Sequence, residues 1–340
     1  MRIVHLILTR SFAGSERHVL ELASAQAADH DVTLILRRAA AQGRPDAYAH
    51  RVDPRVKVEL VGDWFARWHA RRVLRRLRPD IAHAHLSSAS RALQQHDADC
   101  LRLATLHIAY SPRQHAALDA LVAIAPWQLG TIPEPLREHS IQIDNWTLSN
   151  PPAPGARERL RDTNGIPADA FVFGAIGRAE HSKGFDLLIE AFGRARVPEA
   201  WLVVVGQGDQ LAALRRSASE RVLFTGFVER PQDWLATFDC FVSAARKEPF
   251  GLVLLEAMEA GLPILASATL GARHLADAIG TPLLPIGDID ALTAALTAAL
   301  QQQAAAPRER RSYPMHRFDL EAKRAQLEAF YQRELERLKL

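Results

Sequence analysis

The feature that most constrains the fold is an alternation of short apolar runs with segments of helical period. In the first 150 residues the runs that predict strands are RIVHLIL, DVTLIL, VKVEL, DIAHAH, RLATLH, ALVAIA and IQIDNWTL. A second series begins near residue 170 and consists of FVFGAIG, AWLVVVG, RVLFTG, CFVSAA and LPILAS. Apolar, β-branched runs that alternate with helices are typical of parallel strands buried on both faces. Two such series predict an α/β chain with two doubly wound domains.

The boundary between the two series is marked by a change in composition. Proline, glycine and charged residues cluster in SNPPAPGARERL (149–160), which predicts a linker. We therefore expect one domain over residues 1–152 and a second over residues 153–316, which suits a length of 340 residues. Helical periodicity predicts helices over 15–28 and 64–78, and a long amphipathic helix in the last segment, RFDLEAKRAQLEAFYQRELERL.

Composition excludes several classes of protein. A hydrophobic content of 48% and a charged content of 24% describe an ordinary globular protein. The two cysteines, Cys100 and Cys240, are far apart, so the sequence predicts neither a disulfide framework nor a cysteine-based zinc site. No apolar run is long enough for a membrane span, and the apolar part of MRIVHLILTRSFAG is too short for a signal peptide. We therefore expect a cytoplasmic protein.

The basic excess is concentrated in one segment, WFARWHARRVLRRLRP (64–79), which has no acidic residue and contains Arg67, Arg71, Arg72, Arg75, Arg76 and Arg78. Nucleic-acid binding would need a broader basic face, so we expect no nucleic-acid partner. One hypothesis is that residues 64–78 rest on an anionic membrane surface, since Trp64 and Trp68 lie one turn apart among the arginines. The alternative is that the arginines are the solvated face of a helix packed on its sheet.

The loops that follow the strands of the second series are the candidate ligand site, because open α/β sheets bind ligands at the carboxyl ends of their strands. Arg178 and Lys183 follow FVFGAIG, and two cations at a helix N-terminus suit a diphosphate. The alternative is an ordinary solvated loop. Gly206 and Gly208 follow AWLVVVG and allow close backbone approach, although a turn alone would also explain them.

The stretch KEPFGLVLLEAMEAGLPILA contains Glu248 and Glu256, eight residues apart. A helix should begin near Gly251 and end at Gly261, which places Glu256 in its second turn within an apolar run. A buried carboxylate is costly unless something pairs with it, so we expect a ligand there. Two carboxylates and a row of free first-turn amides suit a ligand with hydroxyl and phosphate groups.

Several of these segments together resemble a known family. FGAIGRAEHSKGFDLLIEAF, VVVGQGDQL, VLFTGFV and EPFGLVLLEAMEAGLPILAS are similar to the successive donor-site signatures of the retaining glycosyltransferases of family 4. FAGSERHVLELA, RPDIAHAHL, ATLHIAY and SNP follow the same family's order in the first half. Glu248 and Glu256 fit its E-x7-E motif.

The resemblance implies the GT-B fold, in which two Rossmann-like domains face each other across a cleft. Residues 1–152 would bind the acceptor, residues 153–316 would bind the nucleotide sugar, and a helix over 317–340 would cross back to the first domain.

The resemblance also implies roles for matching residues. Arg178 and Lys183 would neutralise the donor diphosphate, Glu256 would bind the ribose hydroxyls, Glu248 would contact the donor sugar, and His107 would lie beside the reacting sugar. His107, Glu248, Arg178 and Lys183 would therefore be the catalytic residues. The implied donor-binding set is Gly14, Arg178, Lys183, Gly206, Phe227, Val228, Glu248, Phe250, Gly251, Leu252, Val253 and Glu256. The implied acceptor set is Arg10, His85 and Tyr110.

Some residues depart from the family pattern or invite a second interpretation. TLGARHL has Gly271 alone, with Arg273 and His274 where relatives commonly have an acid, which leaves the donor sugar open. The D-x-D of Asp288-Ile-Asp290 precedes a helix and is interpreted as a helix N-cap rather than a metal site. His83 and His85 alternate on one strand and are interpreted as facing opposite sides, one as a core histidine and His85 as reaching the cleft.

The implied activity is a retaining, metal-independent transfer of a sugar from a nucleotide-diphosphate sugar, with a UDP-sugar favoured and GDP-mannose next. No cofactor is expected. The acceptor would be a growing cell-surface glycan or glycolipid, such as lipopolysaccharide, O-antigen, capsule or a lipid-linked oligosaccharide, met at the inner face of the cytoplasmic membrane. Two alternatives stay open: a nucleotide-sugar epimerase or hydrolase of the same fold, and a non-catalytic nucleotide-binding scaffold.

Overall fold

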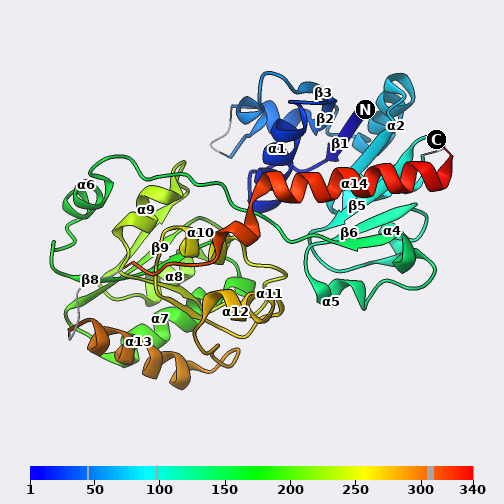
Figure 1. The fold of residues 1–340 in the computed structure, drawn as a ribbon. Helices are drawn as coiled ribbons and strands as arrows, with labels where there is room; N and C mark the ends of the chain where they lie inside the picture. The colour runs from blue at the N-terminus through cyan, green and yellow to red at the C-terminus, as the bar shows by residue number, and fades with distance from the viewer. Residues whose placement is uncertain (44–45, 97–98, 305–309, 340) are drawn as a thin grey trace. The chain divides into compact units, whose positions relative to one another are not determined.

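The computed structural model describes residues 1–43, 46–96, 99–304 and 310–339. The chain forms two compact units (Figure 1). Unit 1 consists of Met1–Trp146 together with Phe318–Leu340, and unit 2 consists of Thr147–Arg317. The predicted division after residue 152 thus lies six residues beyond the one that the contacts define.

Unit 1 is built on a parallel sheet of seven strands in the order β3-β2-β1-β4-β5-β6-β7. In the inner strands of this sheet, buried apolar side chains point to both faces, which is why those segments read as continuous apolar runs. The strands are β1 (Arg2–Ile7), β2 (Asp31–Arg37), β3 (Lys57–Val61), β4 (Ile81–His85), β5 (Leu101–Leu106), β6 (Ala120–Ala123) and β7 (Ser140–Gln142).

Helices cover both faces of this sheet. One core joins β1, β2, β4 and β5 to α1 (Gly14–Gln26) and α14 (Leu320–Leu338). A second core joins the opposite face to α2 (Ala66–Leu77) and α3 (Leu86–Gln94). The short helices of unit 1 are α4 (Pro112–His115) and α5 (Pro126–Leu129), and its 3-10 turns are η1 (Arg38–Ala41), η2 (Ala49–Arg51) and η3 (Leu136–His139). The turn η5 (Met315–Phe318) lies where the chain passes from unit 2 back to unit 1.

The C-terminal helix α14 belongs to unit 1, as predicted (Figure 1). Its apolar side chains Leu327, Phe330 and Tyr331 are buried in the same core as Ile3 and Ile81 of the central strands. Asp319 caps the helix, because its side chain accepts a hydrogen bond from the Ala322 amide at 2.8 Å.

Unit 2 is built on a parallel sheet of five strands in the order β10-β9-β8-β11-β12. The strands are β8 (Phe171–Ile176), β9 (Ala200–Val205), β10 (Val222–Gly226), β11 (Cys240–Ser243) and β12 (Ile264–Ala266). The helices are α6 (Ala156–Thr163), α7 (Phe185–Ala195), α8 (Leu211–Ser217), α9 (Pro231–Thr237), α10 (Leu252–Glu259), α11 (Leu270–His274), α12 (Ala276–Ile279) and α13 (Ile289–Ala304), with the turn η4 (His181–Lys183). α7 and α13 pack on one face of this sheet.

The predicted strands are confirmed except for most of IQIDNWTL. Only Ser140–Gln142 pairs with the sheet, as β7, and residues 143–150 have no regular structure. Ile143 and Trp146 are buried in the core beneath α1, and the Trp146 indole donates to Glu21 Oε2 at 2.8 Å. The apolar residues of this segment are therefore explained by burial of a loop against the core rather than by strand pairing. None of the described helices has the length and apolarity that a bilayer span requires.

Candidate functional site

The strand orders of the two sheets define where each unit can build a site. In unit 1 the order reverses between β1 and β4, and in unit 2 it reverses between β8 and β11. The loops after strands on either side of such a reversal diverge to opposite faces and leave a crevice at the carboxyl edge. In unit 2 these loops contain Arg178, Lys183 and Glu248, and in unit 1 the reversal is lined by histidines.

The structure brings Lys183 and Glu248 together at the reversal point of unit 2. They are 65 residues apart in sequence, yet Lys183 Nζ lies 2.6 Å from Glu248 Oε2. Both side chains are mostly buried, with 21% and 13% exposed. A charged pair that is partly removed from water at a ligand-binding edge is a candidate for exchange with a charged ligand.

A second ion pair fixes the loop that contains Glu248. The Arg246 guanidinium binds both carboxylate oxygens of Asp186, at 2.7 and 2.6 Å, and lowers the pKa of that carboxyl group. The Arg246 amide also donates to the Ser182 carbonyl at 2.8 Å. The loop after β11 is therefore tied to the first turn of α7, and sequence reasoning had not singled out Arg246 or Asp186.

Glycines let the loops at this edge interlock backbone to backbone. A Cβ on Gly184 would lie 2.0 Å from the Ala244 carbonyl oxygen, and one on Gly206 would lie 1.8 Å from that of Gly177. A Cβ on Gly208 would similarly lie 2.3 Å from the Ala179 carbonyl oxygen. The expectation that Gly206 and Gly208 permit close backbone approach is confirmed, and the partner is the loop after β8.

The helix that follows Glu248 begins as predicted. α10 starts at Leu252, and Gly251 precedes it in the left-handed region with φ of +99°. The amides of Leu252 and Val253 lie in the first turn, where no earlier carbonyl of the same helix can accept from them. The N-terminus of α10 can therefore donate hydrogen bonds to a ligand. The Gly271 amide donates to the Glu248 carbonyl at 2.9 Å, which joins the loop after β12 to the same edge.

Glu256 is not buried, which corrects the expectation from its apolar surroundings. The buried side of α10 consists of Leu254, Leu255, Ala257 and Met258, whereas Leu252, Val253 and Glu256 are partly exposed. Because two apolar residues lie on the partly exposed side, the sequence of α10 shows no alternation of apolar and polar residues at helical spacing. Glu256 shares that exposed side with the helix N-terminus, one turn further along.

The other predicted donor residues of unit 2 differ in accessibility. The Arg178 side chain is 67% exposed and donates to Glu180 at 3.3 Å. Phe227 and Val228 are half-buried in the loop after β10, and Phe250 is buried with its ring 5.7 Å from that of His274. Their contacts with a donor remain predictions.

Asp288 caps a helix, as interpreted from sequence. Its Oδ1 accepts a hydrogen bond from the Ala291 amide at 2.9 Å, at the start of α13. Asp290 instead pairs with Arg194 at 3.0 Å.

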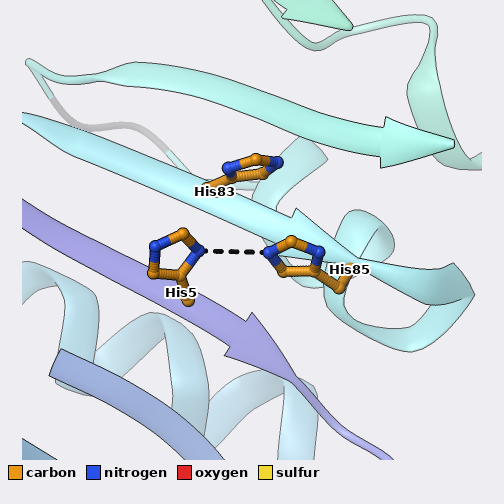
Figure 2. A group of neighbouring side chains, drawn as sticks. All are labelled: His5, His83 and His85. Carbon is orange, nitrogen blue, oxygen red and sulfur yellow. Dashed lines mark hydrogen bonds between the residues drawn. The ribbon is translucent and has the colours of Figure 1, made fainter. Parts of the chain in front are cut away.

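A group of histidines occupies the reversal point of unit 1. Figure 2 shows His5 on β1 beside His83 and His85 on β4. Each is 0% exposed, and strand alternation places all three on the sheet face that α1 and α14 cover. His5 Nδ1 is 3.1 Å from His85 Nε2. The expectation that His83 and His85 face opposite sides of the strand is wrong, because residues two apart share a face. Their rings stack with centroids 4.4 Å apart.

His107 and His18 extend this group toward the carboxyl edge. His107 is half-buried after β5, and its Nε2 lies 3.1 Å from His85 Nδ1. His18 on α1 stacks on Trp146 with centroids 4.1 Å apart and meets the His107 ring edge-on at 4.9 Å. Burial lowers the pKa of His5 and of His107 to about 4, so both are neutral near pH 7.

The remaining predicted residues of unit 1 lie at the same edge of the sheet. Gly14 is the first residue of α1, and Arg10 is exposed in the loop after β1. Tyr110 is half-buried after β5, next to His115. His85 is wholly buried behind His107, so its contact with an acceptor remains a prediction.

Sequence reasoning missed His5 and His18. The available signal was a histidine inside an apolar strand and another on the face of a helix that packs on it.

Comparison with known proteins identifies the class and then the family. The fold matches HepE of Anabaena in complex with UDP-glucose with a TM-score of 0.82, at 20% identity over 97% of this chain and 98% of that one. It also matches WaaG, a glycosyltransferase involved in lipopolysaccharide biosynthesis, with a TM-score of 0.70, at 18% identity over 99% and 98%. The chain therefore has the GT-B fold, as the sequence predicted.

Sequence matches assign the family. Residues 12–170 match Glycosyltransferase Family 4, and residues 156–314 match Glycosyl transferases group 1. The lipopolysaccharide core biosynthesis glycosyltransferase LpsD of Rhizobium meliloti (strain 1021) is 33% identical over 245 residues, which are 68% of this chain and 67% of that protein. The chain belongs to the family 4 glycosyltransferases, and it is a glycosyltransferase.

Proposed function

We propose that this glycosyltransferase moves a sugar from a UDP-sugar to a growing cell-surface glycan of the lipopolysaccharide type, with retention of configuration and without a metal ion. The observation that carries the proposal is the pair of Lys183 and Glu248 at the strand-order reversal of unit 2. At one edge of the sheet, Lys183 would offer a cation to a diphosphate and Glu248 a carboxylate to a sugar hydroxyl.

The chemistry of the leaving group explains the need for these cations. Breaking the bond between the sugar carbon and the phosphate oxygen leaves a nucleoside diphosphate with growing negative charge. Lys183, Arg178 and the first-turn amides at the α10 N-terminus would stabilise that charge as preorganised donors. Glu256, on the exposed side of α10, would accept hydrogen bonds from the ribose hydroxyls.

Retention requires no pair of acid and base carboxylates. The acceptor hydroxyl would attack the sugar from the face that the diphosphate leaves. A new bond forms between the sugar carbon and the acceptor oxygen, the bond to the phosphate oxygen breaks, and the acceptor proton passes to the departing phosphate. His107, at the carboxyl edge of unit 1, would contact the reacting sugar in its neutral form.

The comparisons support the choice of donor and acceptor class. HepE was solved with UDP-glucose, which favours a UDP-sugar, and GDP-mannose is the next candidate. LpsD acts in lipopolysaccharide core biosynthesis, and WaaG is involved in lipopolysaccharide biosynthesis. An acceptor of that kind is a glycolipid at a membrane, so the proposal includes contact with an anionic membrane surface.

α2 and the residues before it are suited to that contact. Trp64 is 85% exposed, Phe65 is 80% exposed and Trp68 is 50% exposed, beside the arginines of the helix. The opposite side of α2 packs into the core through Ala66, Ala70 and Leu74. Exposed aromatic rings flanked by cations are typical of surfaces that rest in a lipid headgroup layer, so packing against the sheet and contact with lipid use different sides of one helix.

The activity is tested by calorimetry with UDP-, GDP- and ADP-sugars, followed by transfer assays on a glycolipid acceptor with product anomers assigned by nuclear magnetic resonance. We expect binding of a UDP-sugar and a product with the anomeric configuration of the donor. Inverted product would contradict retention. Donor turnover that is independent of acceptor would indicate a hydrolase or epimerase, and binding without turnover would indicate a scaffold.

The membrane contact is tested by sedimentation with vesicles of increasing anionic lipid content. We expect the fraction of wild-type chain bound to vesicles to rise with the anionic lipid content. Each basic residue near the surface should contribute on the order of 1 kcal/mol to the binding free energy. A variant with Arg71, Arg72, Arg75 and Arg76 replaced by Gln should lose most of this binding. Equal binding by the two proteins, or none by either, would leave α2 with a structural role.

A further inference from the structure

The buried histidines of unit 1 form two overlapping trios. Among the described residues, two groups have one ring nitrogen from each member within 4.8 Å of the others: an inner trio of His5, His83 and His85, and an outer trio of His18, His85 and His107. Nitrogens this close can share a proton or share a metal ion, and their other partners distinguish the two cases.

The inner trio is satisfied by hydrogen bonds. His83 Nδ1 lies 2.6 Å from the Tyr331 hydroxyl and its Nε2 lies 2.8 Å from the Thr105 hydroxyl. His5 bonds to His85 through Nδ1 and to Gln26 Oε1, at 2.7 Å, through Nε2. Every ring nitrogen in this trio already has a partner, so a metal ion would have to break bonds that hold β1, β4, β5 and α14 together.

The outer trio has an unsatisfied member. His18 is 5% exposed, and within the described part of the chain its Nδ1 has no hydrogen-bond partner. The other two members are joined by one hydrogen bond, between His85 Nδ1 and His107 Nε2 at 3.1 Å, which is the bond that an ion would replace. Two imidazole nitrogens bound tetrahedrally to one zinc ion at about 2.0–2.1 Å would be about 3.3 Å apart. The spacing of His85 and His107 is therefore close to that of two ligands.

The inner hydrogen bonds would support the outer trio. With Gln26 Oε1 as acceptor, His5 donates from Nε2 and accepts at Nδ1, and His85 donates from Nε2. This leaves the lone pair of His85 Nδ1 directed toward His107 Nε2. A histidine that donates its second N–H to a fixed acceptor is the usual support of a metal-bound imidazole.

We propose that His18, His85 and His107 form a site for a divalent transition-metal ion of the zinc class. Three imidazoles without a carboxylate suit zinc, cobalt, nickel or copper rather than magnesium or calcium, which prefer oxygen ligands. His107 is half-buried, so the fourth position opens toward solvent on its side. On binding, His107 would move its proton to Nδ1 and present Nε2 to the ion.

The site shares His107 with the proposed transfer reaction, so it is tested by metal binding rather than by activity, and a failure to bind metal would leave the proposed transfer standing. Co²⁺ is the probe, because a tetrahedral cobalt centre absorbs visible light far more strongly than hydrated Co²⁺; competition with Zn²⁺ then gives the affinity. The variants are His18→Gln and His107→Gln, with His50→Gln as control for an exposed histidine of the same unit. Melting curves without metal establish that each variant folds, and His107→Gln serves alone if His18→Gln does not.

The wild-type chain and His50→Gln should each bind one Co²⁺ ion tetrahedrally and release it to Zn²⁺. The affinity of His18→Gln and of His107→Gln should fall by about 100-fold or more, since loss of an outer-shell partner alone costs about 10- to 100-fold. Absence of the tetrahedral absorption in the wild-type chain would overturn the proposal. Retention of the absorption in both trio variants would also overturn it, because the ion would then lie elsewhere.

Discussion

Replacing Glu248 by Gln should make the chain bind UDP more tightly while it transfers sugar more slowly. In the structure, Lys183 Nζ is held 2.6 Å from Glu248 Oε2. A diphosphate that binds Lys183 must therefore lie beside the Glu248 carboxylate and is repelled by it. The Gln side chain keeps the volume and removes the charge, so Lys183 would be left for the phosphate alone.

The distances set the size of the effect. A phosphate oxygen at about 2.8 Å from Lys183 Nζ would lie at most about 5.4 Å from Glu248 Oε2, given the 2.6 Å pair. Two unit charges at that distance repel by about 3 kcal/mol at an effective dielectric constant of about 20. The diphosphate charge is spread over several oxygens, and the Lys183 and Glu248 side chains are 21% and 13% exposed. About half of the repulsion should survive, which corresponds to roughly tenfold tighter binding.

Calorimetry with UDP measures the effect for the wild type, Glu248→Gln, Lys183→Met and the matched control Glu190→Gln. Glu190 lies on α7 of the same unit and pairs with Arg194, so its removal changes net charge equally. We expect tighter binding only for Glu248→Gln and weaker binding for Lys183→Met. If Glu248→Gln bound UDP no better than Glu190→Gln while keeping the wild-type melting temperature, the pair would not lie beside the diphosphate.

The remaining predictions concern one ligand contact, the metal requirement and two aspects of stability. Glu256→Ala should weaken UDP binding by about 1.5–3 kcal/mol with an unchanged melting curve, and equal affinity by calorimetry would remove Glu256 from the site. Transfer should survive EDTA, and a loss restored by Mg²⁺ or Mn²⁺ would contradict a clamp made of cations and helix ends. Asp239→Ala should cost about 3–5 kcal/mol in urea unfolding, because it removes the carboxylate whose Oδ2 lies 2.9 Å from the guanidinium of the buried Arg161. Burial lowers the folded pKa of His5 and of His107 to about 4, below the unfolded value of about 6.5, so their contribution to stability is full above pH 6.5 and is lost as the pH falls toward 4. The free energy of urea unfolding should therefore be lower at pH 5 than at pH 7.5 by about 2 kcal/mol per group, and equal values would contradict neutral burial.

Local chemistry explains why the strands and several helix ends could be predicted. Continuous apolar runs mark strands buried on both faces, and their bounds agree with β8 and β9 to within a residue or two. The α10 start at Leu252 follows from Pro249 and Gly251, and the α13 cap follows from Asp288. These features depend on neighbours in sequence, which is the information that a single chain provides.

Features that depend on strand order could not be predicted in the same way. The ion pair of Lys183 and Glu248 exists because β8 and β11 are neighbours, although two other strands lie between them in sequence. The exposure of Glu256 depends on which side of α10 packs on the sheet. Because the partly exposed side also contains the apolar residues Leu252 and Val253, the sequence did not indicate which side is buried. The interpretation of His83 and His85 failed for a different reason, since the period of a strand already places residues two apart on one face.

The histidines of unit 1 are polar residues within sequence segments whose apolar pattern predicts a buried strand. β1 and β4 are adjacent in a register that sets His5 opposite His83 and Ile7 opposite His85. On the face toward α1 and α14, an isoleucine lies two residues before the histidine on both strands, so each segment is predicted to be apolar core. Neutral imidazoles tolerate this position only because each one there bonds to another side chain, as His5 does to His85. A histidine at the centre of an apolar strand is therefore a signal to search the neighbouring strand of the sheet, and here that search leads outward through His85 to His107 and the carboxyl edge.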